Sequence, residues 1–247
     1  AKWMPRKGPV ATFLRKELRY SPKKYRQLIV KLSNTVEQKM CEKKWDSIEY
    51  KGVPSVAMNK YRKAFYRNDE KRFTQFIDDV TTGKSKINAS AIFPHTLVKS
   101  MFEGGVTRDS IQAQWNALPN YMEGCEDIVL PICDTSGSMY GLPMEVSIAL
   151  GVYISERNEG GFKNAFMTFS ARPEIHLLSG DLYTRLMQIN RANAGYNTNL
   201  VAAFDLILNT ALENHIPSDE LPNKILVISD MEFDGSSKLR QYTPKTI

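Results

Sequence analysis

The first half of the chain shows hydrophobic positions at helical spacing. Apolar residues recur every three or four positions with Lys and Arg between them, which is typical of amphipathic helices. Ser21 and Pro22 form the start signal of one such helix, with Ser as the N-cap and Pro in the first turn. No alternation of Val or Ile indicates a sheet, so this half is predicted to be an all-α array of packed helices. The predicted helices cover residues 9–20, 22–36, a segment after Ser55, a segment from Asp69 to Gly83, 94–102 and 107–118.

The second half changes to short apolar runs that alternate with helical patterns. Such runs are typical of buried strands, and strands that alternate with helices predict a doubly wound, mostly parallel sheet. The expected fold class is therefore α plus α/β, an all-α helical array followed by a doubly wound domain. The predicted strands are 128–133, 164–169, 173–178 and 224–229, and the predicted helices between them are 143–157, 181–190 and 200–213.

Charge changes sign near the middle of the chain. Residues 1–126 contain 24 Lys or Arg and 13 Asp or Glu, a net charge of +11. Residues 127–247 contain 9 Lys or Arg and 14 Asp or Glu, a net charge of −5. We therefore expect a basic helical domain over residues 1–126 and a second domain over residues 127–247. A basic surface attracts phosphate-rich partners such as nucleic acid, although a solvated Lys-rich helical surface gives the same excess.

Composition argues against several classes of protein. The 24% charged and 42% hydrophobic residues are typical of a globular protein, and no run of about 18 apolar residues predicts a transmembrane helix. The first ten residues lack the apolar core of a signal peptide. Cys41, Cys125 and Cys133 are odd in number and far apart, which argues against a disulfide framework and against a zinc site. We expect a cytoplasmic protein, or a virion-associated one if it is viral.

Acidic and hydroxyl side chains lie beyond two of the predicted strands. Asp134, Ser136 and Ser138 follow the first predicted strand, and Asp230 follows the last one. Thr198 lies on the loop before the last predicted helix. Doubly wound sheets bind ligands at the carboxyl ends of their strands, beside the switch in strand order. The two carboxylates therefore meet in one crevice if the first and last strands are neighbours.

Two carboxylates and three hydroxyls make a site of oxygen ligands only. This chemistry suits a hard cation, Mg²⁺ or Mn²⁺, rather than zinc, and it can leave one coordination position open. An aspartic protease would need a second copy of the motif, a haloacid-dehalogenase-like site would need Asp in place of Ser136, and a serine hydrolase would need GxSxG. No general base accompanies the metal ligands, so we expect a binding protein rather than an enzyme.

The segment DTSGS at residues 134–138, with the distant Thr198 and Asp230, resembles the metal-ion-dependent adhesion site of von Willebrand factor A domains. The family pattern is DxSxS, then Thr, then Asp. In that family the open position of the metal usually receives a carboxylate from a partner protein. The resemblance implies these ligands: Asp134, Ser136 and Ser138 on the first loop, Thr198 on the second loop, and Asp230 directly or through water.

The resemblance extends over most of the chain. The segments YSPKKYR (20–26), VPSVAMNKYRKAF (53–65), KINASAIFPHTLV (86–98) and VISDMEFD (227–234) are similar to a family that plants and phages share. That family joins a helical region to a von Willebrand factor A domain and is distantly similar to the Ro autoantigen (TROVE) proteins, whose ring of helical repeats binds structured or misfolded RNA. About 125 residues supply fewer helices than such a ring needs, so the resemblance implies at most a partial RNA site.

The predicted second domain is shorter than the family pattern. Only 17 residues follow Asp230, where von Willebrand factor A domains continue with two more strands and their helices. The strand over 224–229 would then be an uncovered edge, which promotes aggregation. We therefore expect a C-terminal segment absent from this sequence, or another chain, to cover this strand.

Two functions from different classes follow. The first is a non-enzymatic RNA-binding protein, with RNA on the basic half and an acidic ligand on the metal site. The second is a protein-interaction or virion-associated module whose metal site recruits a partner carboxylate without RNA. Grouping of the basic residues on one surface favours the first function, and their scatter favours the second. The candidate RNA contacts are Arg15, Lys16, Arg19, Lys23, Lys24 and Arg26.

Overall fold

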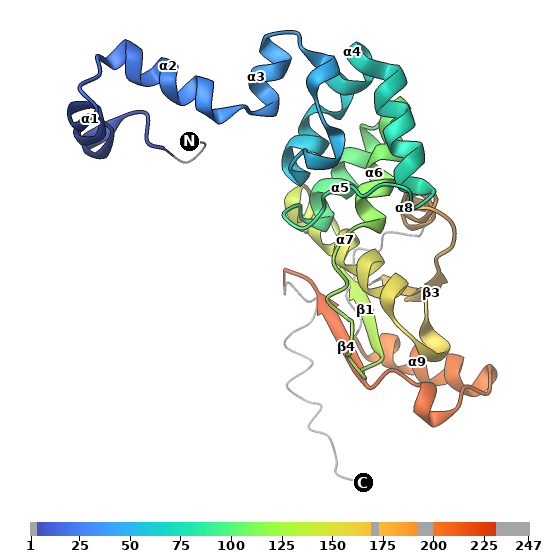
Figure 1. The fold of residues 1–247 in the computed structure, drawn as a ribbon. Coiled ribbons are helices and arrows are strands. Elements are labelled where there is room, and N and C mark those ends of the chain that lie inside the picture. Colours follow the sequence, from blue (N-terminus) through green and yellow to red (C-terminus); the bar gives the residue numbers. More distant parts are fainter. Residues whose placement is uncertain (1–3, 169–172, 192–199, 231–247) are drawn as a thin grey trace. The chain divides into compact units, whose positions relative to one another are not determined.

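The computed structural model describes residues 4–168, 173–191 and 200–230. The chain divides into two compact units, residues 1–88 and residues 89–247. The described part of the first unit is helical, and the second unit combines helices with a four-stranded sheet (Figure 1). At this level the predicted combination of a helical region and a mixed α and β region is confirmed. Among the described residues, no helix is both long enough and apolar enough to cross a membrane.

Helices of very different length make up the first unit. Helix α2 begins as predicted, because the Ser21 hydroxyl accepts a hydrogen bond from the backbone N–H of Lys24 and Pro22 occupies the first position. The elements are α1 (Gly8–Glu17), α2 (Pro22–Ser33), α3 (Val36–Cys41), α4 (Ser55–Thr81) and two short 3-10 turns, Trp45–Ser47 and Tyr50–Gly52.

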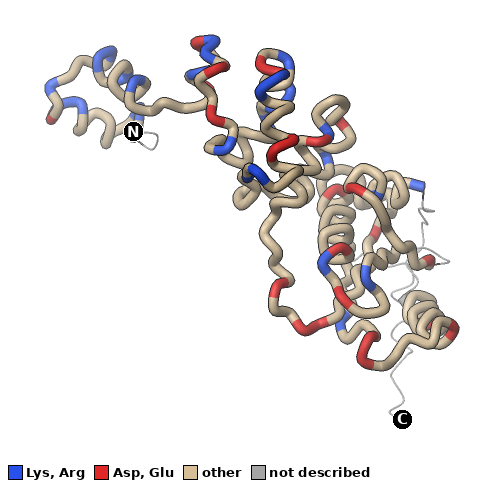
Figure 2. Tube along the Cα trace, turned by 45° about the vertical axis from the view of Figure 1, so that its right-hand side comes forward, with Lys and Arg blue, Asp and Glu red and all other residues tan. Residues whose placement is uncertain are grey.

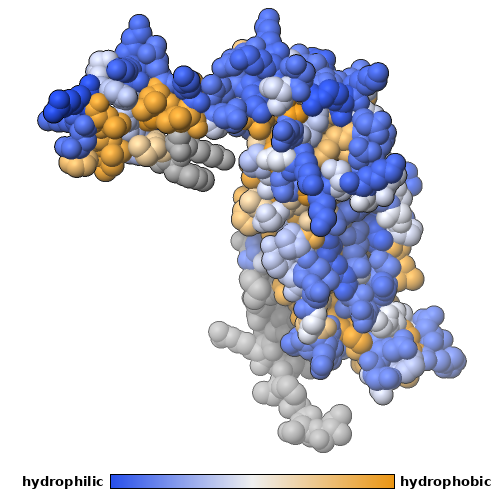
Figure 3. Space-filling model, in the orientation of Figure 1, coloured by the Kyte–Doolittle hydropathy of each residue, from blue (hydrophilic) through white to orange (hydrophobic). Residues whose placement is uncertain are grey.

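Helices α1 and α2 form a hairpin, called the basic hairpin here (residues 8–33). Its core is small: Ala11, Tyr25 and Ile29 are buried, with other apolar side chains packed partly against them. Val10 and Phe13 lie at apolar positions of the predicted pattern but are exposed, because α2 covers only one side of this short helix. Lys and Arg occur along both helices (Figure 2), and the hairpin also presents apolar side chains at its surface (Figure 3).

The predicted helix boundary at Asp69 is a kink inside α4. Asp69 has non-helical backbone angles, φ −149° and ψ 44°. Its Oδ2 accepts hydrogen bonds from the Tyr50 hydroxyl at 2.7 Å and from the Arg72 guanidinium at 2.8 Å. Burial, and then the hydrogen bond to the Asp69 carboxylate, raise the pKa of the Tyr50 phenol, so Tyr50 remains a donor at neutral pH. These two donors hold the kink in place.

The second unit begins with two helices and continues as alternating strands and helices. Its short 3-10 turns are Gly105–Thr107, Gly137–Met139, Gly160–Phe162 and Ser218–Glu220. Its main elements are α5 (Pro94–Phe102), α6 (Arg108–Asn116), β1 (Val129–Cys133), α7 (Leu142–Arg157), β2 (Ala165–Thr168), β3 (Glu174–Leu177), α8 (Leu182–Arg191), α9 (Leu200–Glu213) and β4 (Lys224–Ile228).

The sheet is mixed and has the strand order β3-β2-β1-β4. Strand β1 pairs in parallel with both β2 and β4, as predicted, but β3 runs antiparallel to β2. Only five residues separate Thr168 from Glu174, and a parallel crossover needs a dozen or more. Within the described ranges, β4 pairs with β1 alone.

Helices cover both faces of the sheet. On one face α7 packs against Cys133 and Phe166, and α5, α6 and α8 belong to the same buried cluster; on the other face α9 shares a buried cluster with Leu130 and Ile132 (Figure 1). Helix α7 lies so close to the sheet that a Cβ at Gly151 would be 2.5 Å from both the Cys133 Sγ and the Phe166 ring. Alternate residues of β1 therefore point to opposite faces of the sheet, and β1 contributes to the buried cluster on each face.

Packing joins α5 and α6 to α7 and α8 within the second unit. Leu97, Met101 and Trp115 lie in the same buried cluster as Val152 of α7. The boundary between the compact units consequently lies at residues 88 and 89, whereas the charge pattern placed its boundary at 126 and 127. The charge pattern depends on residues at the surface of the helices, whereas the boundary between compact units depends on which buried faces pack together.

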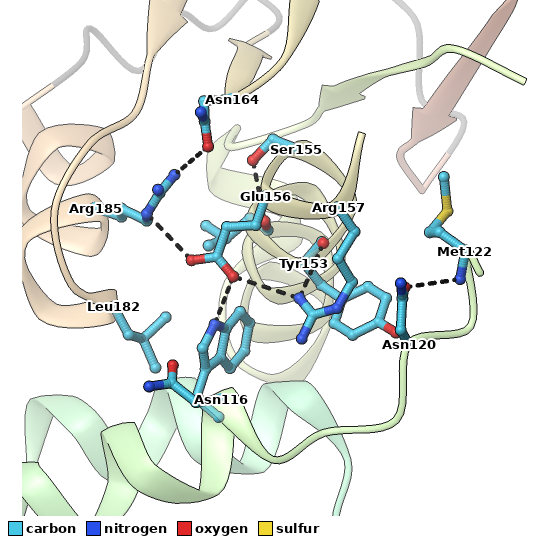
Figure 4. Close-up of polar contacts among 12 residues, drawn as sticks. Asn116, Asn120, Met122, Tyr153, Ser155, Glu156, Arg157, Asn164, Leu182 and Arg185 are labelled. Carbon is cyan, nitrogen blue, oxygen red and sulfur yellow. Dashed lines mark hydrogen bonds and ion pairs between the residues drawn. The ribbon is translucent and has the colours of Figure 1, made fainter. Parts of the chain in front are cut away.

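A polar network fixes α6, α7 and α8 to each other. The Glu156 carboxylate accepts a hydrogen bond from the Trp115 indole at 2.7 Å and forms ion pairs with Arg185 at 3.1 Å and Arg157 at 3.4 Å (Figure 4). Arg185 also donates to the Asn164 side chain at 3.0 Å. All three charged side chains are largely buried, so each depends on its partners for compensation of its charge.

Replacement of Glu156 by Gln is expected to destabilise the second unit. The amide keeps the size of the side chain but loses the charge that Arg157 and Arg185 face, and charge-assisted hydrogen bonds contribute about 1.5–3 kcal/mol each. Denaturant unfolding followed by Trp fluorescence measures the loss. The exposed Glu159, changed to Gln, is the control and should unfold like the wild type; equal stability of the two variants would contradict the role of the network.

Candidate metal centre

The carboxyl ends of β1 and β4 lie side by side. The two strands pair over five residues, from Val129 with Lys224 to Cys133 with Ile228. The ladder continues one step further, because the Asp134 N–H donates to the Ile228 carbonyl at 2.9 Å. The condition under which the two carboxylates meet, that the first and last strands are neighbours, is therefore met. Since β2 lies on the other side of β1, the strand order switches direction here, which is where open α/β sheets bind ligands.

Asp134 is a buried carboxylate at this switch, with only 1% of its surface exposed. Its Oδ1 accepts a hydrogen bond from the Ser136 N–H at 2.9 Å, and its Oδ2 accepts one from the Ser229 hydroxyl at 2.7 Å. No Lys, Arg or His in the described part of the chain forms an ion pair with it. A buried charge without a cation is costly, so this position favours a bound cation.

Two hydroxyls lie on the loop that follows Asp134. The Oγ atoms of Ser136 and Ser138 are 3.0 Å apart, and Ser138 lies in a 3-10 turn while Ser136 directly precedes it. Ser136 is half-buried and Ser138 is exposed. Asp230 lies two residues beyond the end of β4 and is exposed. The structure thus brings these four predicted residues to one end of the sheet, and Thr198 lies outside the described residues.

The donor set fits a hard cation. Asp134 and Asp230 supply carboxylates, and Ser136 and Ser138 supply hydroxyls, which are ligands of the kind that Mg²⁺ binds together with water. Within residues 4–168, 173–191 and 200–230, no three His, Cys, Asp or Glu side chains gather as a metal-binding group. The described oxygen ligands at this end of the sheet are hydroxyls as well as carboxylates.

Two hydroxyls that hydrogen-bond to Asp134 were not predicted from the sequence. Ser229 donates to the Asp134 carboxylate, and the buried Ser147 of α7 donates to the Asp134 carbonyl at 3.2 Å. Ser229 directly precedes Asp230, and its place opposite Asp134 follows once the β1 and β4 register is known. No sequence pattern identifies Ser147, because its contact with Asp134 depends on how α7 packs on the sheet.

Two large exposed side chains follow the loop in the sequence. Tyr140 is 90% exposed, and the neighbouring Leu142 is also exposed. Both follow Ser138 within four residues. An exposed Tyr beside a polar centre is typical of protein-binding surfaces, where Tyr supplies much of the contact energy.

The six basic residues predicted to contact RNA all lie in the basic hairpin or its turn (Figure 2). Five are exposed and Arg15 is half-buried. On α2, Lys23 and Lys24 lie on the side away from the buried Tyr25 and Ile29, and Arg26 is exposed one turn before Ile29. Residues 4–34 contain nine Lys or Arg and one acidic residue, so this segment is the most basic part of the described first unit.

Two family models match the chain in succession. Residues 8–125 match a domain of unknown function (DUF2828), and residues 129–246 match another domain of unknown function (DUF7788). The two matched regions meet immediately before β1.

A viral protein is similar over almost the whole chain. The chain is 29% identical over 261 residues to "Uncharacterized protein L728" of Acanthamoeba polyphaga mimivirus. The match covers 95% of the chain and 46% of that protein, so the chain spans less than half the length of this relative. No solved structure matches the chain significantly.

Proposed function

We propose that the chain is a non-enzymatic binding protein that holds Mg²⁺ or Mn²⁺ at the carboxyl ends of β1 and β4. The observation that carries this proposal is Asp134, a buried carboxylate at the switch point whose partners among the described residues are an N–H and a hydroxyl. A cation there compensates the buried charge. Ser136 and Ser138 supply neutral oxygens, and Asp230 and Thr198 complete the proposed ligand set.

The fold behind this site is proposed to be that of a von Willebrand factor A domain. Support comes from the strand order β3-β2-β1-β4, with helices on both faces of the sheet and the DTSGS loop after its central strand. In this proposal β4 is covered by a further segment or another chain. Two features support that cover: the described residues pair β4 on one side only, and Leu226 is exposed.

The ligand of the metal is proposed to be a carboxylate on a partner protein. With Asp230 acting through water, Asp134 is the one carboxylate of this proposed set that binds the cation directly, so the divalent cation keeps a net positive charge and an anionic group completes its coordination. The exposed Tyr140 and Leu142 offer apolar contact area beside that position. In this scheme no residue acts as a nucleophile. The metal, with the exposed Tyr140 and Leu142 beside it, binds and orients a partner protein.

Divalent-cation stabilisation is the direct test of the metal site. Mg²⁺ or Mn²⁺ should raise the unfolding free energy of the wild type, by about 2.7 kcal/mol at a hundredfold excess over Kd. Asp134→Ala should remove this gain because it deletes the buried carboxylate. Ser138→Ala should reduce it while leaving stability in EDTA unchanged, since Ser138 is exposed.

Thermal unfolding with Mg²⁺, Mn²⁺ or EDTA measures these effects. Asp219→Ala is the matched control, because it removes an exposed carboxylate on a 3-10 turn away from the DTSGS loop. The proposal fails if the wild type does not respond to either cation, or if Asp134→Ala and Ser138→Ala respond as the control does.

RNA binding by the basic hairpin is the second candidate function. It is favoured by the concentration of basic residues on two short helices, where Lys23, Lys24 and Arg26 are exposed together. Residues 4–34 carry a single acidic residue, so little in this segment opposes a phosphate backbone.

Charge reversal tests this candidate. The double variant Lys23→Glu and Lys24→Glu should bind a structured RNA more weakly, with a slope of log affinity against log salt that is shallower by roughly 1–2. Fluorescence anisotropy over a salt series measures both effects, with duplex DNA of the same length for comparison. Lys84→Glu with Lys86→Glu makes the same charge change on exposed residues outside the hairpin; equal effects of the two double variants would remove the hairpin from any RNA site.

A further inference from the structure

A cleft of about 720 Å³ lies within the second unit, lined by α6, the end of α7 and the start of α8. Arg157, Arg185 and Glu156 lie together in its lining (Figure 4), and Trp115 and Leu118 supply the apolar part. The volume is typical of small-molecule sites, and the charged lining suits a polar ligand. The DTSGS loop precedes the first residue of α7 and the cleft lies at its last, so a helix of 16 residues separates the two sites.

The two arginines of the cleft carry more N–H donors than the protein uses. The Arg185 Nε donates to the Gly180 carbonyl at 3.0 Å and its Nη1 donates to the Asn164 side chain at 3.0 Å. The Arg157 Nη1 donates to the Tyr153 carbonyl at 3.3 Å. Arg185 Nη2, Arg157 Nε and Arg157 Nη2 have no hydrogen-bond partner among the described residues. These nitrogens belong to side chains that are only 12% and 13% exposed, so water compensates their charge poorly.

Positive charge exceeds negative charge at the centre of the cleft. Glu156 is the carboxylate that both arginines share, and its oxygens also accept the hydrogen bond from the Trp115 indole (Figure 4). One carboxylate thus faces two guanidinium groups, which leaves an excess of one positive charge on largely buried side chains. An anion in the cleft would compensate this excess.

The remaining polar groups at the edge of the cleft mostly offer donors as well. The Asn116 Oδ1 accepts from the Gln112 side chain at 2.7 Å, and the Asn120 Oδ1 accepts from the Met122 N–H at 3.1 Å. Both amide oxygens are therefore engaged, whereas neither Nδ2 group has a partner in the part of the chain that the structure describes. A ligand that satisfies these groups must be rich in acceptor oxygens.

Asp181 is the acidic residue at the edge of the cleft. Its side chain is exposed, and its Oδ1 accepts a hydrogen bond from the Thr184 N–H at 2.8 Å, at the start of α8. Water and the end of the helix therefore compensate this carboxylate, which leaves the excess positive charge at the centre of the cleft in place.

We propose that this cleft binds the phosphate group of a small molecule. A phosphate has three strong acceptor oxygens and a charge of about −1.5 to −2, so it matches both the unused donors and the excess positive charge. Guanidinium groups bind such oxygens in a fork geometry, and Arg157 and Arg185 hold the phosphate between them. Asn120 donates from the edge of the cleft. A carboxylate has two oxygens, which one guanidinium already saturates, so it uses fewer of these donors.

Unfolding experiments in EDTA test the site, because EDTA removes any contribution of the proposed metal centre. Inorganic phosphate is the probe for the free anion, AMP for an organic phosphate ester, and succinate for a carboxylate, all at constant ionic strength. At least one phosphate probe should raise the melting temperature of the wild type in a saturable manner, and succinate should not. A response to AMP alone would show that the organic part of an ester contributes to binding of the phosphate.

Asn120→Asp is the most direct variant. Asp keeps the oxygen that accepts from Met122 and replaces the Nδ2 donor by an oxygen that repels phosphate, so stability without ligand should not change. The Kd for the phosphate probe should rise at least about tenfold. Asn209→Asp is the matched control, because it makes the same charge change on an exposed residue of α9 that does not line the cleft.

Arg157→Gln removes one of the two guanidinium groups and should raise the Kd by at least as much. Since Arg157 also pairs with Glu156, the melting temperature of this variant without ligand is its own reference. Fluorescence of Trp115 supplies a second measurement, because Trp3→Phe with Trp45→Phe leaves it as the only Trp of the chain. Its emission should change over the same range of phosphate concentration as the melting temperature.

Three results would overturn the proposal. One is a wild type that neither inorganic phosphate nor AMP stabilises. Another is stabilisation by succinate that equals or exceeds that by the phosphate probes. The third is an equal response of Asn120→Asp and Asn209→Asp, which would mean that phosphate acts as a general stabilising salt rather than as a ligand of the cleft.

Discussion

The parallel pairing of β1 with β4 joins segments that lie 95 residues apart in the sequence. All five residues of β1 have a partner in β4, so the two strands end at the same level. This alignment places Ser229 opposite Asp134, and the hydrogen bond between their side chains fixes the carboxylate. A one-residue shift in register would turn Asp134 and Ser229 to opposite faces, because side chains alternate between the faces of a sheet.

Helix α7 connects this end of the sheet to the larger core. Ser147 donates to the Asp134 carbonyl, and the Cys133 thiol approaches the Ser147 carbonyl at 3.3 Å. One turn later Gly151 allows α7 to contact the sheet without a side chain between them. The conformation of the DTSGS loop therefore depends on a close helix-to-sheet contact, and substitutions in α7 act on the loop from within the core.

The sequence was sufficient to predict the helices and strands and the approximate position of the candidate site. Short apolar runs identified the four strands of the described residues, and Ser21 with Pro22 identified the start of α2. The prediction of a mostly parallel sheet did not assign a direction to β3, although the short connection after Thr168 already excludes a parallel crossover. The packing of α5 and α6 on α7 was also missed, because an amphipathic pattern shows that a helix has a buried face but not which element covers it. The same reason explains the unexpected exposure of Val10 and Phe13.

The basic hairpin has little internal support for its order. Its buried residues are Ala11, Tyr25 and Ile29, and burial of a large apolar side chain contributes roughly 1.5–3 kcal/mol. Val10 and Phe13 add no buried area to this core while they are exposed to water. Any contact that buries them stabilises the hairpin as it forms, so order in the hairpin and binding at this surface are coupled.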